Sequence, residues 1–348
     1  MYSLPRKLQN MTPYTPHTEY FPIRLDANES PFLPSETAKA KIKAAIDDIE
    51  FDRYPDPAAK NIRESYAELY GIDPDLLVAS NGSDEIISVI INAFCDAGES
   101  VCVIEPDFSM YRFYAEVCGL NVISIKKKDF VIDPDEVIKT ANESNAQLLI
   151  FSNPCNPTSV GLDRDSVRRI IKNVRCLVVL DEAYMDFYDQ SLMNEVEDYD
   201  NLMILRTCSK MLGLAALRVG ITVSNKRLVS VLNTVRSPYN VNTVSAKAAS
   251  IILNDKEYIR SANRQLIELR DRLYEGVKKA VPNECRVIKP CTNFVTVVTD
   301  KAKDIYDFLK TKGVLIRCFD GFIRITAGTA DENNAVVSAL EEFFYENR

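Results

Sequence analysis

The chain has 348 residues, 46% of them hydrophobic, and this length predicts one large domain with a smaller one rather than a single small core. The formal net charge is −8, and the only marked cationic tract is Lys126–Lys128, which we interpret as a solvated turn, so the composition argues against a nucleic-acid partner. No apolar stretch reaches the ~18 residues of a membrane span, and the N-terminus lacks a basic-then-apolar secretion signal. We therefore expect a cytoplasmic protein without a membrane partner.

The nine cysteines are odd in number and form no C-x-x-C pair, so we interpret them as buried thiols rather than a disulfide framework or a zinc site. Cys155 and Cys208 lie inside motifs discussed below and are interpreted as small space-filling residues. The single histidine, His17, lies in a proline-rich segment, and no serine is marked as a partner for a Ser-His-Asp hydrolase. No metal is expected, and the usual glycine-rich dinucleotide and P-loop signatures are missing.

The first part of the chain predicts an arm followed by alternating strands and helices. Residues 1–34 contain six prolines, which block a regular helix and favour an extended segment lying over another part of the molecule. Helices are then predicted from Ser35 and over about 58–70, with Gly71 placed to end the second. Strands are predicted at 76–79, 100–104, 121–125, 147–151, 176–180, 202–207 and 219–223, and helices at 83–95, 110–118, 134–144 and 163–173. This alternation predicts a three-layer α/β domain with a mainly parallel sheet and helices on both faces.

After Pro238 the pattern changes to that of a smaller α+β domain. Long helices are predicted over about 243–254 and 256–281, and a terminal helix from Thr329, where Thr329–Glu332 has the spacing of a capping box. Strands are predicted near 286–288, 294–298, 314–318 and 322–327, with a helix at 303–312. We divide the chain into an arm (1–34), a large domain (35–250) and a small domain (251–348).

Polar side chains follow several of the predicted strands. The strand-like run at 202–205 leads into a mostly apolar segment that carries Lys210 and Arg218. A lysine among apolar residues can have its pKa lowered by desolvation and become a nucleophilic amine, although most lysines in such a position are ordinary surface residues. The buried run at 176–180 ends at Asp181 and Tyr184. Ligand chemistry collects at such carboxyl ends of strands in open α/β sheets, and a helix N-terminus near Ser83 could hold an anion.

These motifs, taken in order, resemble those of the fold type I pyridoxal-phosphate-dependent aminotransferases, and most closely the histidinol-phosphate aminotransferase branch. The resemblance covers nearly the whole chain, and although each string is weak, together they are strong. The strings are Asn10–Tyr14, Leu25–Pro31, Arg53–Pro55, Gly82–Glu85, Pro106–Tyr111, Asn156–Thr158, Asp181–Tyr184, Ser209–Lys210, Leu217–Gly220 and Ile323–Thr329.

The resemblance implies a pyridoxal 5′-phosphate cofactor and a role for each matched residue. Lys210 would bond the cofactor covalently and later move a proton, Asp181 would pair with the pyridine nitrogen, and Tyr184 would act with Asn156 on the ring oxygen. The remaining cofactor contacts would hold the phosphate or stack on the ring: Ser83, Asp84, Thr207, Ser209, Arg218, Phe108, and Tyr54 from the second subunit of a homodimer. Taken alone, Asp181 could equally cap a turn, and Tyr54 could be an ordinary turn residue.

The resemblance also implies substrate contacts and marks departures from the family. Arg324 would clamp the carboxylate of glutamate, Arg317 could be a second clamp, and Tyr14 would place the arm over the site. Family members often have tyrosine where this chain has Phe108. Ser159 replaces the glycine usual after Asn156–Thr158, and Cys155 replaces a common asparagine, which puts the loop geometry and the substrate in doubt but not the cofactor.

The resemblance therefore favours a transaminase that interconverts histidinol phosphate and imidazole-acetol phosphate with glutamate and 2-oxoglutarate. Threonine-phosphate decarboxylase, a lyase with overlapping motifs, is the first alternative, and an aminotransferase for aromatic or other amino acids is the second. A cofactor-binding regulator is not supported because the sequence contains no helix-turn-helix signature. A nucleic-acid methyltransferase is not supported because the glycine-rich loop is missing. The motifs do not decide between transamination and decarboxylation, and they leave the assembly beyond a dimer open.

Overall fold

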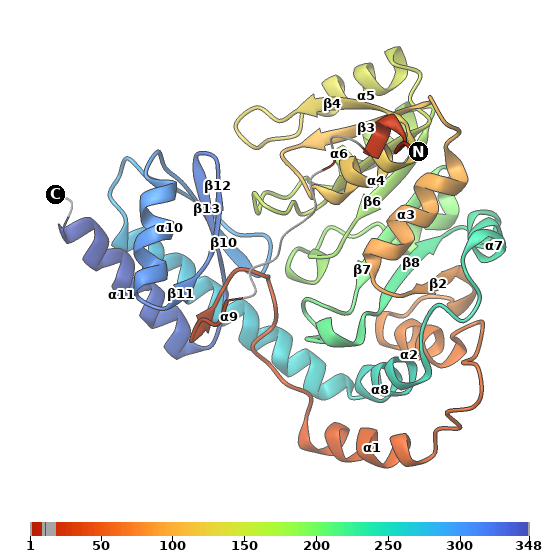
Figure 1. Ribbon diagram of the computed structural model, residues 1–348, viewed down its shortest axis with the longest axis horizontal. Coiled ribbons are helices and arrows are strands. Elements are labelled where there is room, and N and C mark those ends of the chain that lie inside the picture. The colour runs from red at the N-terminus through yellow and green to blue at the C-terminus, as the bar shows by residue number, and fades with distance from the viewer. Residues whose placement is uncertain (1, 9–10, 12–18, 347–348) are drawn as a thin grey trace.

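The centre of the molecule is a seven-stranded sheet (Figure 1) in the order β2-β8-β7-β6-β5-β3-β4. The computed structural model describes residues 2–8, 11 and 19–346. The strands are β2 (Leu77–Ser80), β3 (Ser100–Glu105), β4 (Asn121–Lys126), β5 (Leu148–Ser152), β6 (Leu177–Asp181), β7 (Leu202–Thr207) and β8 (Gly220–Ser224). All of β2, β5, β7 and β8 is buried, and most of their residues are apolar, as expected for a sheet covered on both faces.

Strand β8 runs opposite to the other six strands of this sheet. It pairs antiparallel with both β2 and β7, whereas β3, β4, β5, β6 and β7 pair in parallel. A parallel neighbour requires a crossover connection, usually a helix, but β7 and β8 are joined by a short irregular loop that contains one turn of 3₁₀ helix. The predicted mainly parallel sheet is confirmed, and the carboxyl ends of β3, β5, β6 and β7 lie along one edge.

Helices cover both faces of the large sheet, which confirms the predicted three layers. One face packs against α3 (Ser83–Phe94), α4 (Met110–Cys118) and α7 (Lys226–Val235) through residues such as Ile87 and Leu232. The other face packs against α2 (Lys60–Tyr70), α5 (Pro134–Glu143), α6 (Arg164–Asn173) and α8 (Thr243–Leu253). The sequence analysis missed α7, although its start has a recognisable signal, because Asn225 caps it by accepting from the backbone N–H of Leu228 at 3.0 Å.

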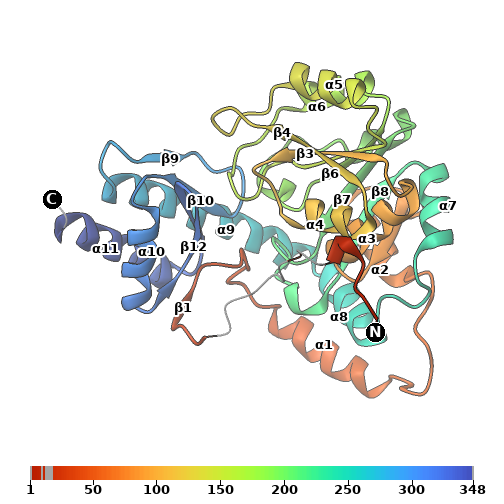
Figure 2. The same cartoon turned by 45° about the horizontal axis from the view of Figure 1, so that its top comes forward.

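A four-stranded antiparallel sheet in the order β12-β13-β10-β9 forms the second part of the molecule (Figure 2). Its strands are β9 (Arg286–Ile288), β10 (Phe294–Val298), β12 (Arg317–Phe319) and β13 (Phe322–Thr326), and it is accompanied by α9 (Lys256–Ala280), α10 (Ala302–Thr311) and α11 (Ala330–Glu346). The capping box before α11 is confirmed, because the Thr329 backbone donates to the Glu332 carboxylate at 2.8 Å and the Glu332 backbone donates to the Thr329 hydroxyl at 3.3 Å.

The described part of the arm joins the two sheets. Strand β1 (Ile23–Arg24) pairs in parallel with β11 (Val314–Leu315), and the backbone N–H of Thr326 in β13 donates to the carbonyl of Leu25 at 3.0 Å. The single strand predicted at 314–318 is therefore two strands, because 314–315 pairs with the arm while 317–319 pairs with β13. Helix α1 (Glu36–Asp47) follows and lies beside α8 (Figure 1). The domain boundaries at residues 34 and 250 stay a prediction.

Candidate active site

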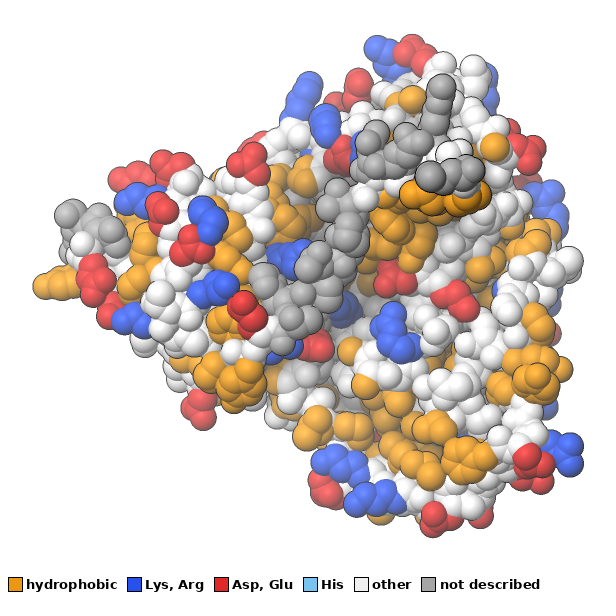
Figure 3. Space-filling model, viewed as in Figure 1, with side chains coloured by type: hydrophobic (Ala, Val, Ile, Leu, Met, Phe, Trp, Pro, Cys, Tyr) orange, Lys and Arg blue, Asp and Glu red, His pale blue; other side chains and the backbone are white. Residues whose placement is uncertain are grey.

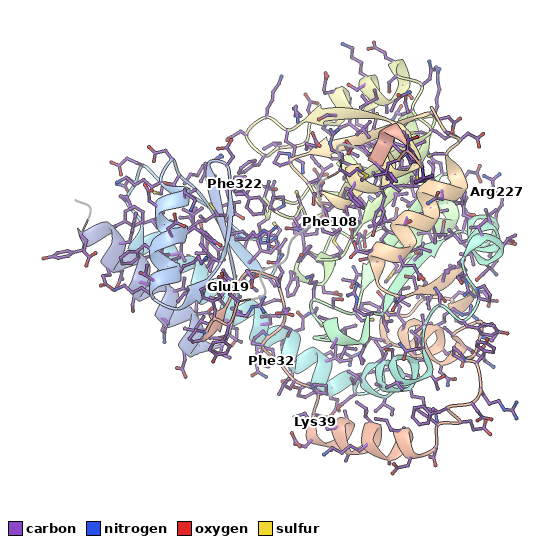
Figure 4. The ribbon with its side chains drawn as sticks, in the orientation of Figure 1. Glu19, Phe32, Lys39, Phe108, Arg227 and Phe322 are labelled. Carbon is purple, nitrogen blue, oxygen red and sulfur yellow. The ribbon has the colours of Figure 1, made fainter. Side chains whose placement is uncertain are left out.

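A cavity of about 400 Å³ opens where the carboxyl edge of the large sheet meets the arm and the small sheet. The arm contributes Asp26, Asn28 and Glu29, and the small sheet contributes Arg324. Most of the predicted site residues line it: Ser83, Asp84, Phe108, Asn156, Asp181, Tyr184, Thr207, Ser209, Lys210, Arg218 and Arg324. Phe108, labelled in Figure 4, lies on the loop after β3 near the centre of the view, whereas the labelled Lys39 and Arg227 lie far out on α1 and α7.

Two predicted residues do not lie with this group, and a third cannot be placed. Tyr54 is 82% exposed and stacks on Tyr239, with ring centroids 4.8 Å apart, away from the cavity of its own chain. Arg317 lies on β12 and is not among the residues that line the cavity. Tyr14 falls outside the described residues.

Lys210 lies on the loop that follows β7, with its amine directed at the arm. Its Nζ donates to the carbonyl of Ala27 at 3.0 Å and lies 5.9 Å from the centroid of the Tyr184 ring. The pKa of Lys210 is lowered to about 8, chiefly by burial. The nearby cations Arg324 and Arg218 also lower this pKa, and the acids Glu29 and Asp84 offset only part of that effect. An appreciable fraction of this amine is therefore neutral, and nucleophilic, near neutral pH.

Asp181 ends β6 and is buried at the bottom of the cavity. Its Oδ2 accepts from the hydroxyl of Tyr111 at 2.7 Å, and its Oδ1 accepts from the backbone N–H of Ala183 at 3.0 Å. Burial raises the pKa of Asp181 to about 6, while these two donors hold it lower than burial alone would. A cationic N–H partner would therefore stabilise the buried carboxylate, because the ion pair would offset the cost of desolvating its charge.

The hydroxyl of Tyr184 is held by a contact that the sequence analysis missed. Nδ2 of Asn28 donates to this hydroxyl at 2.7 Å, and Oδ1 of Asn28 accepts from the hydroxyl of Thr326 at 3.0 Å. Burial raises the pKa of Tyr184 to about 12, so the phenol keeps its proton and can donate it to a ligand oxygen. Asn28 lies inside one matched string and Tyr111 inside another, so their motifs, though not their contacts, were visible in the sequence.

The N-terminus of α3 lies beside Arg218 at the cavity, and Nη2 of Arg218 is 3.8 Å from Oδ2 of Asp84. Gly82 precedes the helix with a positive φ of 83°, and no side chain caps the first turn, so its backbone N–H groups face the cavity region without a capping oxygen. A Cβ on Gly220 would lie 2.6 Å from the backbone nitrogen of Ser83, and one on Gly82 would lie 2.6 Å from the Arg218 guanidinium. Only glycine permits this close approach of β8, Arg218 and the helix start.

Arg324 places a second cationic group on the opposite side of the cavity from α3. Its guanidinium donates to Oδ1 of Asn156 and to the carbonyl of Asp26. It also lies 5.3 Å from the centroid of the Phe294 ring, and its side chain is buried. These contacts hold the planar fork in one orientation, which suits bidentate recognition of an anionic group.

A buried ion-pair network lies behind the cavity and joins the ends of β6 and β7. NH2 of Arg206 lies 2.6 Å from Oδ1 of Asp186, and NH1 lies 3.4 Å from Oε2 of Glu182. The hydroxyl of Tyr66 accepts from Nε of Arg206 at 3.2 Å. Because Glu182 and Arg206 are the direct chain neighbours of Asp181 and Thr207, this network holds two cavity residues in register.

These features fit the needs of pyridoxal 5′-phosphate. The cofactor requires an amine, an acid for its pyridine nitrogen, donors for its ring oxygen, an aromatic partner and a phosphate cradle. Lys210 and Asp181 supply the first two, and the glycine-lined start of α3 is a cradle that a Cβ would fill. The fold and the site define a pyridoxal-phosphate-dependent enzyme of fold type I.

The chain belongs to the aminotransferase class I and II family, whose sequence profile matches residues 22–340. It is 37% identical to the histidinol-phosphate aminotransferase of Clostridium novyi, covering 97% of this chain and 96% of that protein. It is 35% identical to the histidinol-phosphate aminotransferase of Caldanaerobacter subterraneus, covering 92% of this chain and 93% of that protein.

Solved structures show the same fold. The histidinol-phosphate aminotransferase of Sinorhizobium meliloti, solved with pyridoxal 5′-phosphate, superposes with a TM-score of 0.87 at 24% identity, over 94% of this chain and 92% of that one. The L-threonine-O-3-phosphate decarboxylase of Porphyromonas gingivalis superposes with a TM-score of 0.78 at 21% identity, over 93% of this chain and 99% of that one. Within the described residues, no helix is both long and apolar enough to cross a membrane, and no group of three acidic, cysteine or histidine side chains could hold a metal ion.

Proposed function

We propose that this aminotransferase transfers the amino group of histidinol phosphate to 2-oxoglutarate, giving imidazole-acetol phosphate and glutamate, a reaction of histidine biosynthesis. The observation that carries the substrate assignment is near-full-length similarity to several histidinol-phosphate aminotransferases at 34–37% identity. The cavity is compatible with it, because Arg324 can hold either a phosphate or a carboxylate at the far end of a substrate.

Each side chain has a distinct task in this proposal. When bound, pyridoxal phosphate supplies an electron sink for negative charge at the substrate Cα. Lys210 would hold the cofactor, and once released its Nζ would take and return the proton at the substrate Cα. Asp181 keeps the pyridine nitrogen protonated, with Tyr111 fixing the carboxylate. Tyr184 and Asn156 hydrogen-bond the ring oxygen.

The remaining residues position the cofactor and keep water away from the reacting atoms. The backbone N–H groups of Ser83 and Asp84, the hydroxyls of Thr207 and Ser209, and Arg218 hold the phosphate, while Phe108 stacks on the ring. The arm residues Asp26, Asn28 and Glu29 form one wall of the cavity. This wall shields the reacting atoms from water, which strengthens the electrostatic contacts inside.

The active unit in this proposal is a cytoplasmic homodimer in which Tyr54 completes the phosphate site of the other subunit. Two observations support it. Tyr54 does not line the cavity of its own chain although its motif matches the family's. Hydrophobic side chains also gather over α1 and its surroundings (Figure 3), and Ile46 and Phe51, on and after α1, are exposed. An exposed apolar surface of this kind fits a second copy of the chain.

Amine exchange with separately offered substrates tests the assignment. The holoenzyme is mixed with histidinol phosphate, threonine phosphate or an aromatic amino acid, and the absorbance of the cofactor and the release of carbon dioxide are recorded. We expect histidinol phosphate to give the fastest conversion, reversed by 2-oxoglutarate, without carbon dioxide. Carbon dioxide released from threonine phosphate would instead favour the lyase, and a faster reaction with an aromatic amino acid would contradict the proposed substrate. Lys210→Ala is the inactive control.

A further inference from the structure

A buried lysine and a buried cysteine lie side by side just behind the cavity. Lys127 follows β4, and its side chain is 0% exposed, so the predicted solvated turn at 126–128 is wrong for this residue. Lys127 is buried because its amine binds groups that are distant in the sequence. Its Nζ donates to the carbonyl of Pro106 at 2.8 Å and lies 3.4 Å from Oδ2 of Asp107, both on the loop after β3.

The sulfur of Cys155 completes this cluster. Cys155 lies on the loop that follows β5 and is buried, and its Sγ lies 2.9 Å from Nζ of Lys127. The thiol also donates to the carbonyl of Pro106 at 3.5 Å. The separation of nitrogen and sulfur is short for a hydrogen bond to sulfur. It is close to the spacing that one oxygen atom bonded to both would impose, whereas a direct nitrogen–sulfur bond would need a much closer approach.

A reaction here needs the amine to lose its proton and the oxidant to have access. Burial lowers the pKa of Lys127, but Cys155 and Asp107 outweigh it and raise the pKa, so the amine must lose a proton before it reacts. Burial also raises the pKa of Asp107, but a carboxylate is still a much weaker base than an amine, so solvent hydroxide has to take that proton. Lys127 and Asp107 line a second cavity of about 370 Å³, through which a molecule as small as hydrogen peroxide can reach the amine; Cys155 does not line this cavity and lies behind Lys127.

We propose that Lys127 and Cys155 form a covalent N–O–S crosslink when the protein meets a peroxide. One peroxide converts the thiol to a sulfenic acid and releases water. A second converts the neutral amine to a hydroxylamine and releases water, and the two hydroxyl groups then condense with loss of a third water. Nitrogen and sulfur are each oxidised by two electrons, the two peroxides accept all four, and solvent hydroxide takes the proton of the ammonium.

The crosslink would tie the end of β4 to the loop that carries Asn156. Oδ1 of Asn156 accepts from Arg324, so this loop contributes directly to the cavity. Cys155 is also the position at which the family resemblance leads us to expect an asparagine. The chemistry depends on neither the cofactor nor the substrate, and the inference stands or falls separately from the proposed function.

Peptide mass spectrometry of the holoenzyme tests the proposal. The protein is treated with hydrogen peroxide, blocked with a thiol reagent and digested with trypsin without reduction. We expect the peptide of Cys155 joined to one in which cleavage after Lys127 has failed, with a mass equal to their sum plus one oxygen minus two hydrogens. Dithiothreitol should release both peptides. Cys208 is the internal control and should not be crosslinked, because it is equally buried and no lysine amine hydrogen-bonds to its sulfur in the described structure.

Two variants separate the crosslink from simple thiol oxidation. Lys127→Arg keeps the charge beside Asp107 but offers no amine of the same reach, so Cys155 should then be found only as oxidised acids. Cys155→Ser removes the sulfur and should restore cleavage after Lys127. The proposal is overturned if Cys155 in the wild-type protein stays a thiol, if it is oxidised to acids with Lys127 free, or if the joined peptides lack the extra oxygen.

Discussion

The hydroxyl of Tyr111 lies 2.7 Å from Oδ2 of Asp181 and donates a hydrogen bond to this buried carboxylate. A hydrogen bond to a charged group contributes roughly 1.5–3 kcal/mol. We therefore expect Tyr111→Phe to lower the free energy of unfolding of the apo protein at pH 7 by about this amount, measured by urea denaturation. In an Asp181→Asn background the same substitution should cost less. Equal costs in both backgrounds would mean that the contact with Asp181 is not what Tyr111 contributes.

The pH dependence of stability provides a second test of Asp181. Its pKa of about 6 in the folded protein lies above the ordinary 3.8, so the folded state binds more protons than the unfolded state between these values. The contribution of this group to the free energy of unfolding therefore falls as the pH rises from about 4 to 6. Asp181→Asn should remove that fall, so the free energy of unfolding of the variant should rise relative to that of the wild type as the pH increases across this window. A difference that does not change with pH would contradict the raised pKa.

Lys210 should react as an amine with a midpoint near pH 8. The expectation follows from its burial and from the adjacent cation Arg324, which lower its pKa to about 8. An amine-reactive reagent applied to the apo protein over pH 6–10, followed by mass spectrometry of the peptide, measures this midpoint. Arg324→Gln removes one of the causes and should move the midpoint upward.

Lys210→Ala should abolish turnover while circular dichroism shows the fold unchanged, and turnover retained in that variant would exclude Lys210 as the catalytic amine.

Tyr54 should act only across a dimer. Lys210→Ala and Tyr54→Phe homodimers should each have little activity. Dimers formed after mixing them should recover up to about a quarter of the wild-type rate, since half are mixed and each of these has one intact site. Tyr345→Phe, a change at another exposed tyrosine, is the control and should remain fully active. A fully active monomer in sedimentation under assay conditions would disprove the arrangement.

Arg324 should serve both substrates because histidinol phosphate has no α-carboxylate to bind. Arg324→Lys keeps the charge but loses the planar fork, and the loss of a charge-assisted contact of about 1.5–3 kcal/mol should reduce kcat/KM roughly ten- to hundredfold. Rapid-mixing measurements with histidinol phosphate and with glutamate should show the loss in both half-reactions. Arg317→Lys is the matched control and should change neither much. If only glutamate were affected, Arg324 could not be the shared anion clamp.

Gly220→Ala should weaken cofactor binding, because its Cβ would meet the backbone of Gly82 and Ser83 at 2.6 Å and displace the start of α3. Fluorescence titration of the apo protein with pyridoxal phosphate measures the dissociation constant, which we expect to rise at least tenfold. Gly119→Ala is the control, since it forces alanine to a positive φ of 77° with nothing within 4 Å of the added carbon. It should cost about 1 kcal/mol of stability and leave cofactor binding unchanged.

The sequence alone predicted the order of most strands and helices and, through the family resemblance, many of the residues that line the cavity. The residues of an element by themselves indicate whether it is buried. The apolar runs at 148–151 and 202–205 mark β5 and β7, and the helical spacing of apolar residues marks α9. The residues at the ends of these strands, such as Asp181 and Lys210, can then be predicted to lie near one another, because the carboxyl ends of parallel strands meet at one edge of the sheet.

Only the tertiary structure decided which segments meet. The reversed direction of β8, the division of 314–318 between the arm and β13, and the contacts of Asn28 with Tyr184 and Thr326 join residues far apart in the chain. Local periodicity tells which face of an element is buried, but not which partner buries it. Lys127 shows the same limit, because three successive lysines favour a solvated turn until the Pro106 carbonyl, Asp107 and Cys155 surround the middle one.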